Sequence, residues 1–134
     1  MTDQIHRILT RVQKPARYVG GEYNQIVKRK QDIDVRVAFC FPDTYEIGMS
    51  NIGMRILYAT MNQVPGVWCE RVFAPWGDME AEMRRAGIPL YALESGDPVS
   101  AFDVVAFSLG YEMAYPAVLN MLDLAGIPPV SYTH

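Results

Sequence analysis

The sequence predicts a doubly wound α/β fold, in which a mostly parallel sheet carries helices on both faces. Residues 35–41 (VRVAFCF) form a nearly continuous run of strand-forming side chains that ends at Pro42, which is typical of a buried parallel strand. The tripeptide Gly-Ile-Pro follows an alanine twice, at residues 87–89 and 126–128. Glycine tolerates left-handed backbone and proline prevents further helix, so each copy is predicted to be a helix-to-strand turn. Strands and helices therefore alternate along the chain, as a parallel sheet requires.

The individual elements follow from hydrophobic periodicity and from end signals. Residues 4–12 place apolar side chains at helical spacing before Pro15, which predicts a short amphipathic helix within an amino-terminal arm, residues 1–34. The remaining residues, 35–134, are predicted to form the α/β domain. Its predicted strands are 35–41, 67–73, 90–93 and 102–109, and the last is expected to be as buried as the first. Its predicted helices are 50–63, 75–86, and one that ends before Gly126. Pro75 is expected in the first turn of the second helix.

Composition and length exclude several classes of protein. With 134 residues, 50% of them hydrophobic and 20% charged, the chain has the size and composition of one folded domain. The longest unbroken apolar run, 37–41, has five residues, whereas a membrane-spanning helix requires roughly 20. Two cysteines, Cys40 and Cys69, are too few for a disulfide-stabilised secreted domain. We therefore expect a cytoplasmic protein with no membrane partner, in which Cys40 is a buried and unreactive thiol.

Charge is distributed unevenly along the chain. Residues 1–36 hold eight basic and four acidic side chains, whereas residues 37–134 hold four basic and eleven acidic ones. A basic arm can contact the phosphates of RNA or DNA, and this is one hypothesis for its role. The alternative is an arm that is solvated or docked on another domain, because the chain has no nucleic-acid-binding signature.

A ligand is expected at residues 41–53, because doubly wound sheets bind ligands over the carboxyl ends of their strands. Gly48 and Gly53 lie five positions apart before a helix, which resembles the start of a phosphate loop. Met54 and Arg55 then stand where such a loop has lysine and a hydroxyl side chain, and the chain has no Gly-x-Gly-x-x-Gly motif. The glycines are interpreted either as part of a ligand crevice or as residues needed for a tight turn and close packing.

Polar residues near this crevice also have two interpretations. Asp43 and Glu46 can perform acid–base chemistry, although an aspartate before threonine is also typical of a turn. Ser50 can contact a ligand, or it can cap the following helix, as can Asn51. Ser108, at the carboxyl end of a predicted strand, has the same two alternatives.

Residues 43–48 (DTYEIG) resemble the Asp-x-His-x-x-Gly loop of cobalamin-binding domains, with Tyr45 in the position of the histidine. In that family the histidine is the lower ligand of cobalt, and the aspartate orients its other ring nitrogen. A phenol with a reference pKa near 10 is a poor neutral ligand, so Tyr45 is expected to fill or shield the lower face of a corrinoid rather than coordinate it. A second family motif, Ser-x-Leu, is matched in part by Ser108, with Gly110 in the leucine position and Tyr111 beside it.

A wider resemblance covers nearly the whole chain. The amino-terminal region of bacterial radical SAM proteins with a cobalamin-binding-like domain is similar to residues 14–24 (KPARYVGGEYN), 41–48, 70–80 (ERVFAPWGDME), 102–112 and 120–128 (NMLDLAGIP). The resemblance implies a flavodoxin-like or Rossmann-like fold and, as partner, a catalytic barrel in the same polypeptide. In that barrel a Cys-x-x-x-Cys-x-x-Cys motif holds a [4Fe-4S] cluster and S-adenosylmethionine. Two cysteines 29 positions apart cannot form this site, so the chain is expected to be a non-catalytic domain of a longer protein.

These observations lead to two hypotheses for function. The first is an accessory cobalamin-binding-like domain whose crevice is formed by Asp43, Tyr45, Gly48, Ser50, Gly53, Ser108, Gly110 and Tyr111. The second is a domain that has lost the cofactor and serves in substrate or partner docking, with its crevice filled by Tyr45 and Met49. Neither assigns catalytic residues or a metal site, and the two histidines, His6 and His134, exclude a multi-histidine site in the body.

Overall fold

The sheet has three parallel strands, β1 (Val35–Phe41), β2 (Val67–Phe73) and β3 (Val104–Phe107), in the order β2-β1-β3. The structure is a computed structural model, and it describes residues 3–130. β1 pairs with β2 over its full length, from Val35 opposite Val67 to Phe41 opposite Phe73. β1 and β2 begin and end where the sequence predicts, because each is an almost uninterrupted run of strand-forming residues with partners on at least one side.

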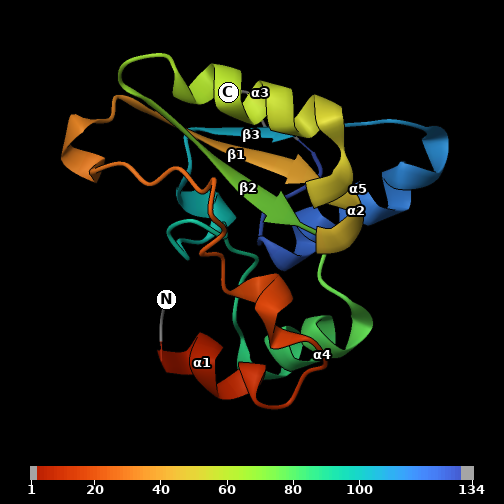
Figure 1. Cartoon of the computed structure of the whole chain (residues 1–134). Helices are drawn as coiled ribbons and strands as arrows, with labels where there is room; N and C mark the ends of the chain where they lie inside the picture. Colours follow the sequence, from red (N-terminus) through yellow and green to blue (C-terminus); the bar gives the residue numbers. More distant parts are fainter. Residues whose placement is uncertain (1–2, 131–134) are drawn as a thin grey trace.

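Helices cover both faces of the sheet, which confirms the predicted doubly wound α/β fold (Figure 1). α3 (Ile52–Asn62) lies on one face, and α1 (Asp3–Leu9), α4 (Gly77–Ala86) and α5 (Tyr115–Leu124) lie on the other. The side chains of β1 point alternately to the two faces of the sheet. Val37 and Phe39 pack with the α3 side, whereas Ala38 and Cys40 pack with α1, α4 and α5. The short helix α2 (Tyr45–Ser50) follows β1 directly.

The amino-terminal arm packs against the rest of the molecule. Its helix α1 ends at Leu9, three residues before the predicted end, and Ile8 and Leu9 are buried in the core beside α4. Two 3-10 helices follow, at Pro15–Tyr18 and Lys30–Asp32. Basic side chains of the arm pair with acids of the body, as in Arg17–Glu46 (2.6 Å) and Lys30–Asp97 (2.6 Å). These contacts hold the arm on the body.

Two predicted helices have different boundaries in the structure. The helix expected over 50–63 is divided into α2 and α3, because Asn51 has extended backbone and its side chain accepts a hydrogen bond from Met54 N at 2.9 Å. Asn51 therefore caps a new helix, as one interpretation of the sequence proposed. The helix expected from Pro75 begins at Gly77, since Trp76 still has extended backbone.

Two predicted strands were wrong in length or in kind. β3 is shorter than the expected 102–109, and a 3-10 helix (Val99–Ala101) precedes it. β3 is also less buried than expected, with Val104 45% exposed, whereas β2, at the opposite edge of the sheet, is almost fully buried. Residues 90–93 form no strand: their only ladder contact is an isolated antiparallel bridge between Tyr91 and Pro98.

Both Gly-Ile-Pro segments end a helix as predicted, but within residues 3–130 neither leads into the predicted strand. Gly87 and Gly126 have φ angles of 68° and 69°, in the left-handed region. The following isoleucine N–H groups bond back to carbonyls five residues earlier, Ile88 to Met83 and Ile127 to Leu122, at 2.9 Å in each case. The same connector therefore ends α4 and α5, as the sequence predicts.

None of the helices described within residues 3–130 has the length and apolar character needed to cross a membrane.

Candidate functional site

The predicted crevice residues lie on two separate segments. Ser108 continues from β3 and its N–H bonds to Cys40 O at 3.0 Å, and Gly110 and Tyr111 after it are exposed. Asp43 lies on the other segment, where its carbonyl accepts a hydrogen bond from Ala74 N at 2.9 Å and so joins the loop to the end of β2. Within residues 3–130, no hydrogen bond or ion pair connects 108–111 to 43–53.

Tyr45 is directed toward β2 and the arm. Its ring packs edge-on against Phe73, with the centroids 5.6 Å apart and the planes at 81°. Its hydroxyl donates a hydrogen bond to Glu22 Oε1 at 2.9 Å. Burial, followed by the hydrogen bond to Glu22, raises the pKa of Tyr45 to about 12, so the phenol is neutral at ordinary pH.

Gly48 is buried where α2 crosses β2. A Cβ atom at this position would lie 2.1 Å from Phe73 Cε1, which is far inside van der Waals contact. The absence of a side chain therefore allows α2 to pack closely on the ring of Phe73. Of the other residues of this segment, Ser50 donates its hydroxyl hydrogen bond to Glu46 O at 2.7 Å, and Gly53 is exposed in the first turn of α3.

These residues do not fit a corrinoid held by a lower ligand from this loop. The side chain at the ligand position, Tyr45, is a neutral phenol engaged with Phe73 and Glu22. His6 is the one imidazole within the described range, and it is exposed on α1. Residues 3–130 contain no cluster of His, Cys, Asp and Glu that can hold a metal ion.

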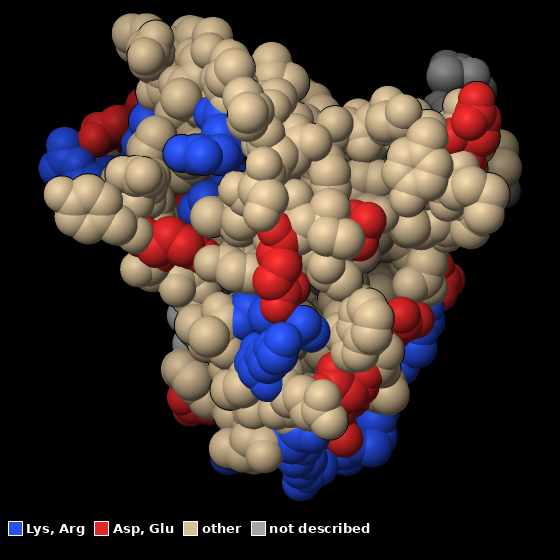
Figure 2. Space-filling view, turned by 45° about the vertical axis from the view of Figure 1, so that its right-hand side comes forward, with Lys and Arg blue, Asp and Glu red and all other residues tan. Residues whose placement is uncertain are grey.

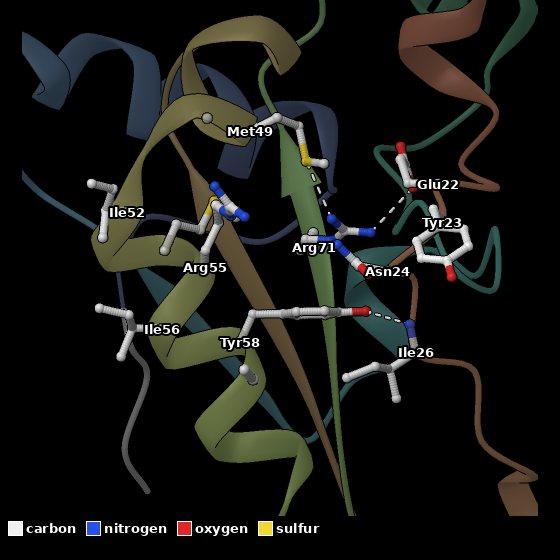
Figure 3. Close-up of a pocket in the computed structure, with 13 residues that line it drawn as sticks. Glu22, Tyr23, Asn24, Ile26, Met49, Ile52, Arg55, Ile56, Tyr58 and Arg71 are labelled. Carbon is white, nitrogen blue, oxygen red and sulfur yellow. Dashed lines mark hydrogen bonds and ion pairs between the residues drawn. The ribbon is translucent and has the colours of Figure 1, made fainter.

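A large pocket lies between α3 and the amino-terminal arm, above β2. Its volume is about 820 Å³, and it is bounded by α3, the end of α2 and residues 22–26 of the arm (Figure 3). We call it the α3–arm groove. Its lining comprises Glu22, Tyr23, Asn24, Ile26, Gly48, Met49, Ile52, Met54, Arg55, Ile56, Tyr58, Ala59 and Arg71. Of the predicted site residues, only Gly48 contributes to it.

Arg71 of β2 forms the floor of the α3–arm groove (Figure 3). Its side chain is 7% exposed and lies 4.5 Å from the centre of the Tyr58 ring. Its Nε donates to Glu94 Oε1 at 2.6 Å and its Nη2 to Glu22 Oε2 at 3.2 Å. Two carboxylates thus balance the charge of this buried guanidinium. Removal of either carboxylate would leave the guanidinium poorly paired. Burial raises the pKa of Glu94 despite its contact with Arg71.

The arm side of the groove is fixed by backbone hydrogen bonds at Ile26. Its N–H donates to the hydroxyl oxygen of Tyr58 at 2.8 Å, and its carbonyl accepts from Trp68 Nε1 at 3.0 Å. Because Tyr58 belongs to α3 and Trp68 to β2, both elements position the same residue of the arm. The two walls of the groove are therefore tied together and the opening between them is preformed.

Arg55 differs from Arg71 in having no compensating acid. It is exposed in the first turn of α3, and within residues 3–130 its side chain makes no ion pair or hydrogen bond. Figure 3 shows its guanidinium turned toward the space between α3 and Arg71. Around it are exposed apolar side chains, with Ile52 69%, Ile56 59% and Tyr23 102% exposed. Among residues 3–130, the groove thus has an apolar rim with one unpaired cation, Arg55.

Several basic residues of the arm are paired with acidic side chains. Figure 2 shows one face of the molecule, on which basic and acidic side chains lie next to one another. The ion pairs of the arm include Arg11–Glu82 at 3.6 Å and Arg29–Asp32 at 2.9 Å. Nucleic-acid binding by the arm stays a prediction.

Reasoning from the sequence alone missed the residues of the groove. Arg71 carried a usable signal, because alternation in residues 67–73 places this charged residue on the same face as Cys69 and Phe73. A charge on a buried strand face requires a partner. The partners Glu22 and Glu94 are 49 and 23 residues away, and no local pattern indicates them.

Fold and site together define a doubly wound α/β domain with an open pocket beside its sheet. A family model described as the N-terminal region of radical SAM proteins matches residues 53–133, and the chain belongs to this family. No curated protein and no solved structure matches the chain. The predicted relation to radical SAM proteins is confirmed, and the chain is an accessory domain of such a protein.

Proposed function

We propose that this accessory domain recognises part of a substrate or of a partner in the α3–arm groove and holds no cobalt through residue 45. The observation that carries the proposal is the position of Tyr45. Its hydroxyl is bound to Glu22, the same residue that contacts Arg71 in the groove. The loop that resembles the lower-ligand loop of cobalamin-binding domains contributes Gly48 and Met49 to one end of the groove.

The family membership supports the role within the parent protein. The cluster and S-adenosylmethionine would be held by the catalytic barrel, which is the proposed partner of this domain in the same polypeptide. The two cysteines of the described region, Cys40 and Cys69, are fully buried, and burial raises the pKa of each to about 12. Neither thiol is suited to nucleophilic or ligand chemistry. The contribution of this domain is therefore binding.

Cobalamin retention tests the first half of the proposal. The purified chain is incubated with hydroxocobalamin and dialysed, and the absorption spectrum of the retained material is recorded for the natural sequence and for Tyr45→His. We expect neither protein to retain the cofactor, because a side chain at position 45 faces Phe73 and Glu22.

Stoichiometric retention by Tyr45→His, with the spectrum of a histidine-ligated corrinoid, would contradict the proposal. Retention by both proteins would instead support the crevice predicted between residues 43–53 and Ser108, Gly110 and Tyr111. Circular dichroism of both proteins is the control for folding.

A further inference from the structure

We infer that the α3–arm groove takes a ligand with one anionic group, a carboxylate, sulfonate or phosphate, attached to an apolar body. This inference rests on the proposed function, since it specifies the ligand of the same groove. It follows from the difference between the two arginines of the groove and from the apolar side chains around them.

The two arginines have different roles because their charges are balanced differently. Arg71 is buried and already contacts Glu22 and Glu94, so it can accept another anion only by giving up a carboxylate. Arg55 is exposed and unpaired within the described residues, so its five N–H donors are available. An anion that reaches the groove is therefore expected to pair with Arg55, and Arg71 is expected to keep its present partners.

The position of Arg55 on its helix adds to the attraction for an anion. α3 has 11 residues, and Arg55 lies in its first turn. Asn51 satisfies one N–H group at this end, that of Met54. The N–H groups of Ile52 and Gly53 make no hydrogen bond within residues 3–130. The partial positive charge of a helix start and the guanidinium thus lie together at the rim of one pocket.

The remainder of the groove requires an apolar ligand body. Ile52, Ile56 and Ala59 of α3 line it on one side, with Met49 at its end and Ile26 on the arm. Glu22 is the one carboxylate in the lining, and both of its oxygens are engaged, by Tyr45 and by Arg71. No free acid therefore competes for Arg55 or favours a cationic ligand. A volume of about 820 Å³ has the size that small-molecule sites usually have.

The fluorescent probe anilinonaphthalene sulfonate tests this inference, because it joins one sulfonate to an apolar ring system. Its binding is measured by fluorescence titration for the natural chain, Arg55→Ala and Arg7→Ala. Arg7 is an exposed arginine of α1 outside the groove, so its substitution is the matched control. We expect Arg55→Ala to weaken binding about threefold to tenfold, as for loss of one partly solvated ion pair, and Arg7→Ala to leave it unchanged. Phenylnaphthylamine, which lacks the sulfonate, should bind both arginine variants as it binds the natural chain.

A third variant separates the inference from the proposed function. Ala59 is exposed and lines the groove, so Ala59→Trp fills part of the pocket without disturbing the core. If Ala59→Trp abolishes probe binding while Arg55→Ala has no effect, the groove binds ligands but the anionic preference is wrong. If Ala59→Trp leaves probe binding unchanged, the probe binds elsewhere and the proposed function fails as well. Loss of probe binding in Ala59→Trp, together with the threefold to tenfold weakening in Arg55→Ala, supports both.

Discussion

Tyr45 and Gly48 are both explained by one neighbour, Phe73. The ring of Phe73 receives the edge of Tyr45 and occupies the space that a side chain at position 48 would need. Phe73 is 8% exposed and lies at the end of β2, so it joins α2 to the sheet on the groove side. At the scale of single residues, the loop after β1 is thus organised by packing on β2.

The phenol of Tyr45 gives a pH dependence of stability. In the folded state its pKa is raised to about 12, whereas in the unfolded chain it is about 10. The folded state therefore keeps a proton that the unfolded state loses, and this stabilising contribution is complete below pH 10 and disappears as the pH rises toward 12. We expect Tyr45→Phe to reduce the loss of stability in this range, as measured by urea unfolding at several pH values.

The control is Tyr23→Phe, which removes the same hydroxyl from a fully exposed side chain. An unchanged slope between pH 10 and 12 in Tyr45→Phe would contradict a raised pKa of this hydroxyl in the folded state.

Substitution of Gly48 tests the contact with Phe73. Gly48→Ala places a methyl group where the ring of Phe73 now lies, and we expect a loss of about 1–3 kcal/mol in the free energy of unfolding, as is usual for overpacking. Gly77→Ala is the matched control, because a Cβ there would meet nothing within 4 Å. Equal stability of the two variants in urea titrations would mean that α2 does not pack on Phe73 as described.

At the scale of elements, the arm belongs to the main core. Ile8 of α1 is 3% exposed among residues of α4 and α5. We expect Ile8→Ala to destabilise the protein by about 2–4 kcal/mol, through lost transfer energy and a residual cavity. Thermal or urea unfolding measures the effect, with Ile47→Ala, at a side chain 53% exposed, as the control. A loss no larger than that of the control would indicate an arm that is not packed in solution.

The two helix-ending turns make a prediction about backbone conformation. A Cβ at Gly87 or at Gly126 would meet no atom within 4 Å, so alanine at either position is disfavoured only by the positive φ. We expect Gly87→Ala and Gly126→Ala each to cost about 1–2 kcal/mol, with similar values because the two turns have the same geometry. Chemical denaturation compares them, and a neutral effect at either glycine would contradict the assignment of left-handed backbone there.

Elements with local causes were predictable from the sequence, and those with distant causes were not. β1 and β2 are each seven residues long and consist mostly of strand-forming side chains, and the glycine turns need only neighbouring residues. Residues 90–93 look like a strand locally, but their N–H groups bond to three different partners. Leu90 N bonds to Leu124 O, Ala92 N to Asp97 O and Leu93 N to Arg71 O. Such a division of partners arises only from the tertiary fold.

At the scale of the whole molecule, the candidate site was predicted only in part. The sequence directed attention to the segment that leaves β1, and Gly48 and Met49 of that segment line the α3–arm groove. The face of the sheet on which this segment packs is determined by Phe73, Glu22 and Arg71, which are remote from it in sequence. The arm determines the other wall through the backbone of Ile26 and the side chain of Glu22, whose partners in α2, α3 and β2 are remote in sequence.

The central claim is that ligands of this domain bind between α3 and the arm. Proton–nitrogen correlation NMR spectra, recorded while anilinonaphthalene sulfonate is added to the natural chain and to Ala59→Trp, test it most directly. The account predicts that the amide signals of Asn24, Arg55 and Ile56 shift in the natural chain and stay in place in Ala59→Trp. Shifts confined to Ser108, Gly110 and Tyr111, equal in both proteins, would contradict it and move the site to the carboxyl end of β3.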